Sequence, residues 1–151
     1  MNGIFYFKPM ASIFTKIING DIPCYKIAET EDFFAFLDIN PNAEGHTLCI
    51  PKKEVDKILD LDEETYMGLM AFSRRIGKAI EATIPCERVG FTVIGLEVPH
   101  VHVHVIPLHS MANATMADSQ NSSTKSSLSS SFDLSKEIFI LIMVEESSTM
   151  T

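Results

Sequence analysis

Apolar and polar positions along the first two thirds of the chain predict five β-strands and two helices. Five short apolar runs are each bounded by polar or turn-forming residues, which is typical of β-strands. They are Tyr25–Ala28, Phe33–Leu37, His46–Pro51, Val89–Ile94 and His100–Ile106. The first three precede one long stretch with helical spacing, and the last two follow it.

Capping signals predict two helices. Ser12 is placed to cap a short helix over residues 13–19. Asp60 and Glu63 resemble a capping box for a long helix, in which apolar residues recur at spacings of three and four. We expect this helix to end at Ile84, because a proline follows and disfavours helical geometry in the residue before it.

The chain divides into three parts by composition. We expect an N-terminal extension over residues 1–10, a folded domain over 11–115, and a flexible tail over 116–151, in which serine dominates from Ser119 to Ser131. The apolar run Ile138–Val144 leaves two alternatives open, a docked strand or helix and an exposed apolar tail.

Composition and charge narrow the class of partner. Hydrophobic residues make up 46% and charged residues 21%, as in an ordinary globular domain. The net charge of −8 would repel a nucleic acid polymer, so we expect a small anionic ligand held by local groups. No apolar run is long enough to span a bilayer. Three separated cysteines without a CxxC pair favour reduced thiols and a cytoplasmic protein.

The most informative motif is a run of three histidines separated by valines, from His100 to His104. In a strand, successive side chains point to opposite faces, so the imidazoles share one face and the valines can enter a core. Imidazole titrates near neutrality and can act as a nucleophile, a proton carrier or a metal ligand. Three in register predict a chemical site.

Strand geometry separates two of these roles. His100 and His104 would lie roughly 13 Å apart along a straight strand, too far to share one ion. A metal would therefore need ligands from elsewhere, such as His46 or Glu97, and we expect none. Nucleophilic attack on phosphorus accounts for all three histidines, because one attacks while its neighbours donate hydrogen bonds.

The motif, a His-x-His-x-His run followed by two apolar residues, resembles the signature of the histidine triad (HIT) family. Three further segments are similar to that family: residues 11–28 with the phrase IINGDIPCYKI, Phe36–Pro41, and Gly45–Lys52. The resemblance covers about Ala11 to Leu108 in matching order. It points to the nucleoside phosphoramidase-like branch, of the bacterial type.

The resemblance implies both a fold and an activity. The fold is α+β, a five-stranded antiparallel sheet with one long and one short helix. Two copies usually pair into a homodimer with a continuous ten-stranded sheet. The activity is that of a nucleotide hydrolase or transferase, adenosine 5′-monophosphoramidase-like, which acts at the α-phosphate of purine nucleoside phosphoramidates without a cofactor. The implied partner is a purine nucleotide such as AMP.

Matching positions imply roles for four histidines. His102 matches the nucleophile that carries a covalent nucleotidyl intermediate. His104 and His100 match the flanking triad members, and His46 matches a fourth histidine of the active site.

Other positions match the nucleotide-binding part. Asp38 is a natural acceptor for two ribose hydroxyls, with capping of the following turn as the alternative. Phe36 and Ile39 could hold a base, with strand core as the alternative. Gly95 and Glu97 lie where the family meets the phosphate and the leaving group.

The segment before the triad departs from the family pattern. Gly95 is followed by Leu96 and Glu97, where the family commonly has Gly-Gln-Ser or Gly-Gln-Thr. When ionised, Glu97 can only accept hydrogen bonds and would repel a phosphate, unless it is protonated or aimed at a cationic amine. Two alternatives therefore stay open, a nucleotide-binding module with weak catalysis and a dinucleoside polyphosphate hydrolase.

Overall fold

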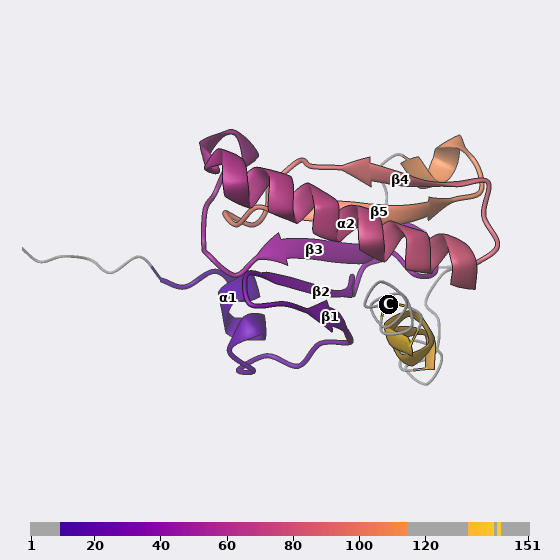
Figure 1. Cartoon of the computed structure of the whole chain (residues 1–151), viewed down its shortest axis with the longest axis horizontal. Coiled ribbons are helices and arrows are strands. Elements are labelled where there is room, and N and C mark those ends of the chain that lie inside the picture. Colours follow the sequence, from indigo (N-terminus) through magenta and orange to yellow (C-terminus); the bar gives the residue numbers. More distant parts are fainter. Residues whose placement is uncertain (1–9, 115–132, 141, 143–151) are drawn as a thin grey trace, which may run out of the picture.

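A computed structural model describes residues 10–114, 133–140 and 142 (Figure 1). Its centre is a five-stranded antiparallel sheet in the order β1-β2-β3-β5-β4. The strands are β1 (Lys26–Glu29), β2 (Phe33–Leu37), β3 (Thr47–Pro51), β4 (Arg88–Thr92) and β5 (Val103–Leu108). The predicted α+β fold with five antiparallel strands is confirmed.

The helices are α1 (Ile13–Ile18) and α2 (Glu63–Thr83), with short 3-10 turns at Ile58–Asp60 (η1) and Met111–Ala114 (η2). Ser12 caps α1 as predicted, since its Oγ accepts from the Thr15 backbone N–H at 3.1 Å. The long helix also ends where predicted, with Ile84 extended beyond its last turn.

The predicted cap of the long helix is wrong by two residues. Asp62, not Asp60, caps α2, because its Oδ1 accepts from the Thr65 backbone N–H at 2.8 Å. Asp60 lies in the 3-10 turn η1, and Leu61 is extended between this turn and the helix. Both aspartates suit the cap by type, and the turn decides between them.

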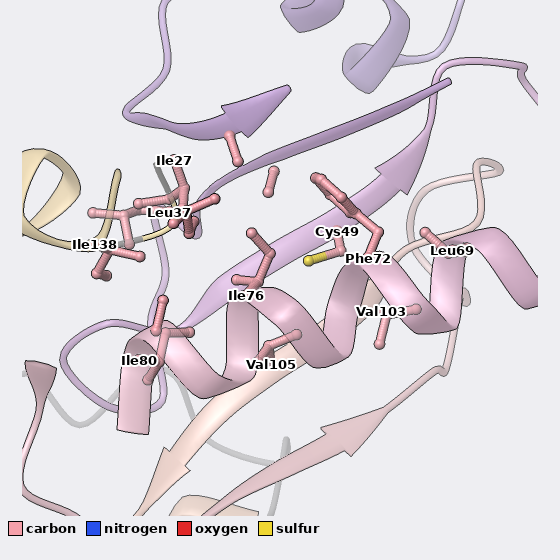
Figure 2. Packing of buried hydrophobic residues seen from close by; sticks show 14 of the residues in the cluster. Ile27, Leu37, Cys49, Leu69, Phe72, Ile76, Ile80, Val103, Val105 and Ile138 are labelled. Carbon is pink, nitrogen blue, oxygen red and sulfur yellow. The ribbon is translucent and has the colours of Figure 1, made fainter. Parts of the chain in front are cut away.

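The sheet has an apolar core on each face. Figure 2 shows the larger one, where α2 packs against alternate strand residues. Its members include Leu37, Cys49, Leu69, Phe72, Ile76, Ile80, Val103 and Val105. On the opposite face, Phe14 of α1 packs with Phe34, Phe36, Leu48 and Ile50. The predicted entry of the valines of the histidine run into a core is confirmed, since Val101, Val103 and Val105 are buried.

Residues 133–140 form a helix that packs on the domain. Ile138 is fully buried and belongs to the same core as Ile27 and Leu37, which it approaches in Figure 2. This part differs from the flexible tail expected over 116–151, and the docked helix is the alternative that the structure contains. The serine-rich stretch from Ser119 to Ser131 and the extension over 1–9 lie outside the described residues.

Across the described ranges, none of the helices combines the length and the apolar character needed to cross a membrane.

Candidate active site

The register of three strands brings Asp38, His46 and His104 together. Thr47 pairs with Val105 across β3 and β5, and Val105 faces the core beneath α2. Because side chains alternate, the adjacent residues His46 and His104 point to the opposite face. Asp38 follows β2 and donates its backbone N–H to the His46 carbonyl at 2.9 Å. Its carboxylate Oδ2 lies 3.6 Å from His46 Nε2.

The hydrogen bonds of His46 and His104 allow one arrangement of protons. His46 Nδ1 accepts the backbone N–H of Asn42 at 3.1 Å, so the proton of the neutral ring is on Nε2. His46 Nε2 lies 2.9 Å from His104 Nδ1 and therefore donates to it. His104 must then carry its own proton on Nε2, where it is a donor for a bound group.

His102 has the opposite tautomer. Its Nδ1 lies 2.7 Å from the backbone carbonyl of His100, which can only accept, so Nδ1 carries the proton. The Nε2 lone pair of His102 is then free for nucleophilic attack. The ring is held by edge contacts with Phe14, centroid to centroid 5.1 Å, and with His104 at 4.9 Å.

His100 lies on the predicted face, but its ring is bonded within the protein. Strand β5 begins only at Val103, because residues 96–100 bend, so the histidine run is not one straight strand. The three imidazoles still share one side, since Phe14 contacts the His100 and His102 rings and His102 contacts His104, while the valines enter the core beneath α2. The His100 ring is fully buried, with Nε2 2.7 Å from the Pro51 carbonyl and Nδ1 2.7 Å from Ser12 Oγ. Both nitrogens are used inside the protein, which leaves none for a substrate.

Burial favours the neutral form of His46, His100 and His104. It is the main cause that lowers the pKa of His46 to about 3 and that of His104 to about 4, and positive charge on neighbouring histidines adds to both shifts. Burial also lowers the pKa of His100. The pKa of Asp38 is raised, again mainly by burial, although the Asn40 hydrogen bond and His102 oppose the shift.

The ligand atoms of Asp38, His46 and His104 lie within 4.8 Å of one another and are the group among the described residues that could hold a metal ion. Coordination by His46 Nε2 would move its proton to Nδ1, which already faces the Asn42 N–H. Two donors would then oppose each other. The arrangement therefore fits a proton-bearing hydrogen-bond chain better than a metal centre.

The nucleotide-binding candidates divide into exposed and buried residues. Phe36 is 3% exposed and packs against Phe14 in the core, so the strand-core alternative describes its surroundings. Ile39 is 78% exposed and available for contact. Asp38 Oδ1 accepts the Asn40 backbone N–H at 2.9 Å, the capping alternative, which leaves other lone pairs of the carboxylate unused.

The loop between β4 and β5 carries the remaining candidates. Gly95 has a φ of +71°, a conformation that favours glycine. Leu96 is 90% exposed, and Glu97 is exposed as well. The raised pKa of Asp38 is due mainly to burial, and the charge of Glu97 adds to it.

Three contacts of the site were not foreseen from the sequence. They come from the Asn42 N–H, the Pro51 carbonyl and the Ser12 hydroxyl. Two of these groups belong to the backbone and carry no residue signal. Ser12 was predicted as a cap, but its contact with a residue 88 positions away needs the tertiary fold.

The lowered histidine pKa values predict a pH dependence of stability. Unfolding returns these rings to their ordinary pKa of 6.5, so below that pH the unfolded chain binds protons that the folded protein does not. The free energy of unfolding should therefore fall from pH 7 to pH 5, by on the order of 1–2 kcal/mol for His46. Urea denaturation at the two pH values measures it.

The control for this experiment is His46→Asn, which removes the largest of these shifts. Its free energy of unfolding should depend less on pH over the same range than that of the wild type. Asp38 acts in the opposite direction, because a raised carboxyl pKa favours the folded state as pH falls. Equal pH dependence in the two proteins would contradict the assignment of a neutral, buried His46.

Known proteins resemble this chain in sequence. Adenosine 5′-monophosphoramidase HNT1 of Saccharomyces cerevisiae is 42% identical over 98 residues, which cover 64% of this chain and 62% of the yeast protein. The chain thus matches just under two thirds of that relative's length. Adenosine 5′-monophosphoramidase hnt1 of Schizosaccharomyces pombe is 41% identical over 100 residues, or 65% of this chain and 74% of that protein.

Solved structures resemble it in fold. A Hit-like protein involved in cell-cycle regulation from Bartonella henselae has a TM-score of 0.71 and 28% identity, and the match covers 85% of this chain and 95% of that one. A zinc-bound histidine triad family protein from Mycobacterium smegmatis has a TM-score of 0.73 and 26% identity, with 92% and 98% covered. The HIT domain model matches residues 19–111. The sequence motif, the fold and these matches agree, and the chain belongs to the histidine triad family.

Proposed function

We propose that this protein hydrolyses purine nucleoside phosphoramidates at the α-phosphate through a covalent nucleotidyl intermediate on His102. The observation that carries the proposal is the 2.7 Å hydrogen bond from His102 Nδ1 to the His100 carbonyl, because it leaves Nε2 unprotonated. The names of the two yeast relatives, both adenosine 5′-monophosphoramidases, support the substrate class.

The reaction proceeds in two displacements. His102 Nε2 attacks phosphorus, a bond from nitrogen to phosphorus forms, and the bond from phosphorus to the leaving amine breaks as that amine takes up a proton from solvent. Water then attacks the same phosphorus, the bond to His102 breaks, and the nucleoside monophosphate departs. The proton taken by the amine is returned by this water, so the net reaction adds one water across the P–N bond.

His104 and His46 stabilise the phosphoryl group in this proposal. His104 Nε2–H donates to a phosphoryl oxygen, and His46 holds His104 in that tautomer through the 2.9 Å bond between their rings. A neutral donor suits the step, because both pKa values lie well below neutrality. His100 acts as a positioning residue, since both of its ring nitrogens are bonded within the protein.

The nucleoside lies beside Asp38 and Ile39. The unused lone pairs of the Asp38 carboxylate accept from ribose hydroxyls. Exposed Ile39 offers an apolar contact for the base. Phe36 is buried and does not contact the nucleotide directly. It supports the site by packing against Phe14, which contacts the His102 ring.

Glu97 sets a preference for the leaving group. Glu97 is exposed in the loop before the triad, and its charge acts on Asp38, so it adds a second negative group to that of Asp38. An anionic leaving group, such as the polyphosphate portion of a dinucleotide, would be repelled, whereas a cationic amine would be attracted. This favours phosphoramidates of amines that carry a further positive charge over dinucleoside polyphosphates.

We further propose a homodimer formed through β4. Strand β4 is an edge of the sheet, and such an edge leaves backbone groups open to pairing with a second chain. Phe91 on β4 is 44% exposed, and Tyr66 and Met67 on α2 are 40% and 60% exposed. Two copies paired through β4 would bury these apolar groups and form a continuous ten-stranded sheet.

The nucleophile is tested by His102→Ala with adenosine 5′-phosphoramidate as substrate. Removing the attacking nitrogen should lower kcat by at least about 10³-fold, whereas the exposed His109→Ala should keep the wild-type rate. Release of AMP is followed by chromatography, and a radiolabelled nucleotide should stay on denatured wild-type protein but not on the variant. Equal turnover by the two variants would overturn the role of His102.

The leaving-group preference is tested by Glu97→Gln. We compare kcat/KM for two adenosine phosphoramidates, one with a lysine-like cationic amine and one with a neutral amine of equal length. An exposed charge contributes modestly, so the variant should reduce the preference for the cationic substrate by about two- to fivefold. Glu87→Gln, an exposed carboxylate at the far end of β4, is the control. An unchanged preference in Glu97→Gln would contradict the proposal.

The dimer is tested by sedimentation equilibrium. The wild type should have a mass of about twice 16.8 kDa, and Phe91→Glu should shift it toward the monomer by placing a charge in the buried interface. Phe139→Glu is a matched control, because Phe139 is also 44% exposed but lies on the helix of residues 133–140. A monomeric wild type, or equal dissociation of both variants, would rule out pairing through β4.

A further inference from the structure

A polar cluster joins the start of α1 to the histidine triad. It consists of Ser12, Thr15, Glu54 and His100, which come from three separate parts of the chain. Ser12 Oγ lies 2.7 Å from His100 Nδ1, and Glu54 Oε2 accepts the Ser12 backbone N–H at 3.0 Å. Glu54 Oε2 also accepts the Thr15 hydroxyl. Ser12, Thr15 and Glu54 have no role in the reaction described above.

We propose that Glu54 and Ser12 are positioning residues, which hold His100 so that its carbonyl keeps His102 in the tautomer that attacks. The proposal rests on the proposed function, since it concerns the orientation of the same nucleophile. In this proposal Glu54, an exposed carboxylate, and Ser12, a helix cap, both affect the rate of hydrolysis.

The protons of the cluster can be assigned. His100 Nε2 lies 2.7 Å from the Pro51 carbonyl and must donate to it. In the neutral ring Nδ1 then accepts, so the Ser12 hydroxyl donates to Nδ1 while its oxygen accepts the Thr15 N–H at 3.1 Å. Ser12 is 6% exposed and His100 is fully buried, so water does not readily replace this bond.

Glu54 accepts hydrogen bonds from the first turn of α1 and from its cap. The Ser12 N–H and the Thr15 hydroxyl both point to one carboxylate oxygen, and a bond of this kind to an ionised acceptor is stronger than one to a neutral acceptor. These bonds, led by that of Thr15, lower the pKa of Glu54 and keep it ionised. The carboxylate thus attaches the first turn of α1 to the loop after β3.

The same loop holds the chain beside the nucleophile. The Pro51 carbonyl accepts from the His100 ring, and the Val55 carbonyl accepts the Val101 backbone N–H at 2.8 Å. The segment 100–101 is therefore hydrogen-bonded both to residues 51–55 and to Ser12 at the start of α1. The peptide carbonyl of His100, which fixes His102 Nδ1, lies between these contacts.

Helix α1 also touches the nucleophile directly. The Phe14 ring lies 5.8 Å from the His100 ring and 5.1 Å from the His102 ring, centroid to centroid. A loosened first turn of α1 would move Phe14 away from both imidazoles. The cluster consequently acts on His102 by two routes, through the His100 carbonyl and through Phe14.

A purely structural cap would not need Glu54. Asp62 caps α2 from within its own helix, by accepting the backbone N–H and the hydroxyl of Thr65. Ser12 already caps α1 in the same local way. Glu54 comes from 42 residues away, and its negative charge acts on His100 to raise its pKa, against the lowering by burial and by the charge of His102.

The experiment compares Ser12→Ala, Ser12→Thr and Glu54→Ala with Asp62→Ala, which removes the equivalent cap of helix α2. Asp62 Oδ2 also lies 3.8 Å from Lys53 Nζ in the loop after β3, but both side chains of this pair are exposed, so its loss should matter little. Ser12→Ala and Glu54→Ala should each lower kcat for adenosine 5′-phosphoramidate by about tenfold with KM within twofold of the wild type, because the nucleophile is misoriented and binding is untouched. Ser12→Thr retains a hydroxyl and should recover most of the rate. Asp62→Ala should lose stability but keep kcat.

A second measurement is independent of turnover. Nitrogen-15 NMR of the imidazoles should show a protonated Nδ1 on His102 and an unprotonated Nδ1 on His100 in the wild type. Ser12→Ala and Glu54→Ala should broaden or shift the His102 Nδ1–H signal, and Glu54→Ala should lower the pKa of His100, whereas Asp62→Ala changes neither.

The outcomes separate the two proposals. A wild type without turnover contradicts the proposed function, while the NMR comparison still decides the positioning role. An unchanged His102 Nδ1–H signal in both Ser12→Ala and Glu54→Ala would overturn that role. So would a kcat within twofold of the wild type in both variants, or an equal loss of kcat in Asp62→Ala.

Discussion

The hydrogen bond between His102 Nδ1 and the backbone carbonyl of His100 is the interaction on which the site depends. It leaves the second ring nitrogen of His102 with a lone pair. A carbonyl can only accept, so the tautomer is decided by a group that does not itself titrate. Neighbouring hydrogen bonds hold that carbonyl in place. The His100 ring is fixed on both sides, and the neighbouring peptide of Val101 is bonded to the loop after β3.

Burial of His46 and His104 lowers the stability of the folded protein at low pH, and near neutrality it keeps both rings neutral. His46 and His104 are nearly inaccessible, and one nitrogen of each ring accepts a hydrogen bond, which fits only a neutral ring. A chain of donors and acceptors with one consistent proton arrangement is favourable when every member is satisfied. His46 and His104 therefore form a preorganised pair that presents one N–H, beside a ring that presents one lone pair.

Local sequence signals predicted the elements well and their connections less well. Ser12, Ile84 and the strand Phe33–Leu37 lie where capping, proline and apolar patterning placed them. Asp62 replaced Asp60 as the cap of α2, because the 3-10 turn before it could not be seen in the pattern. The helix of residues 133–140 was obscured by the serine-rich composition around it. Burial of Ile138 depends on a core formed by β1, β2 and α2.

The sequence by itself determined the chemistry available and the family, because alternating valines and histidines dictate which side chains can enter the core and which remain beside it. The tertiary structure decided which histidine does what. His100 is identical in type and spacing to its neighbours, but both of its ring nitrogens are bonded within the protein, because Ser12 and Pro51, far apart in the chain, meet around its ring. Tautomers are set by such partners, many of them backbone groups, and residue spacing carries no information about them.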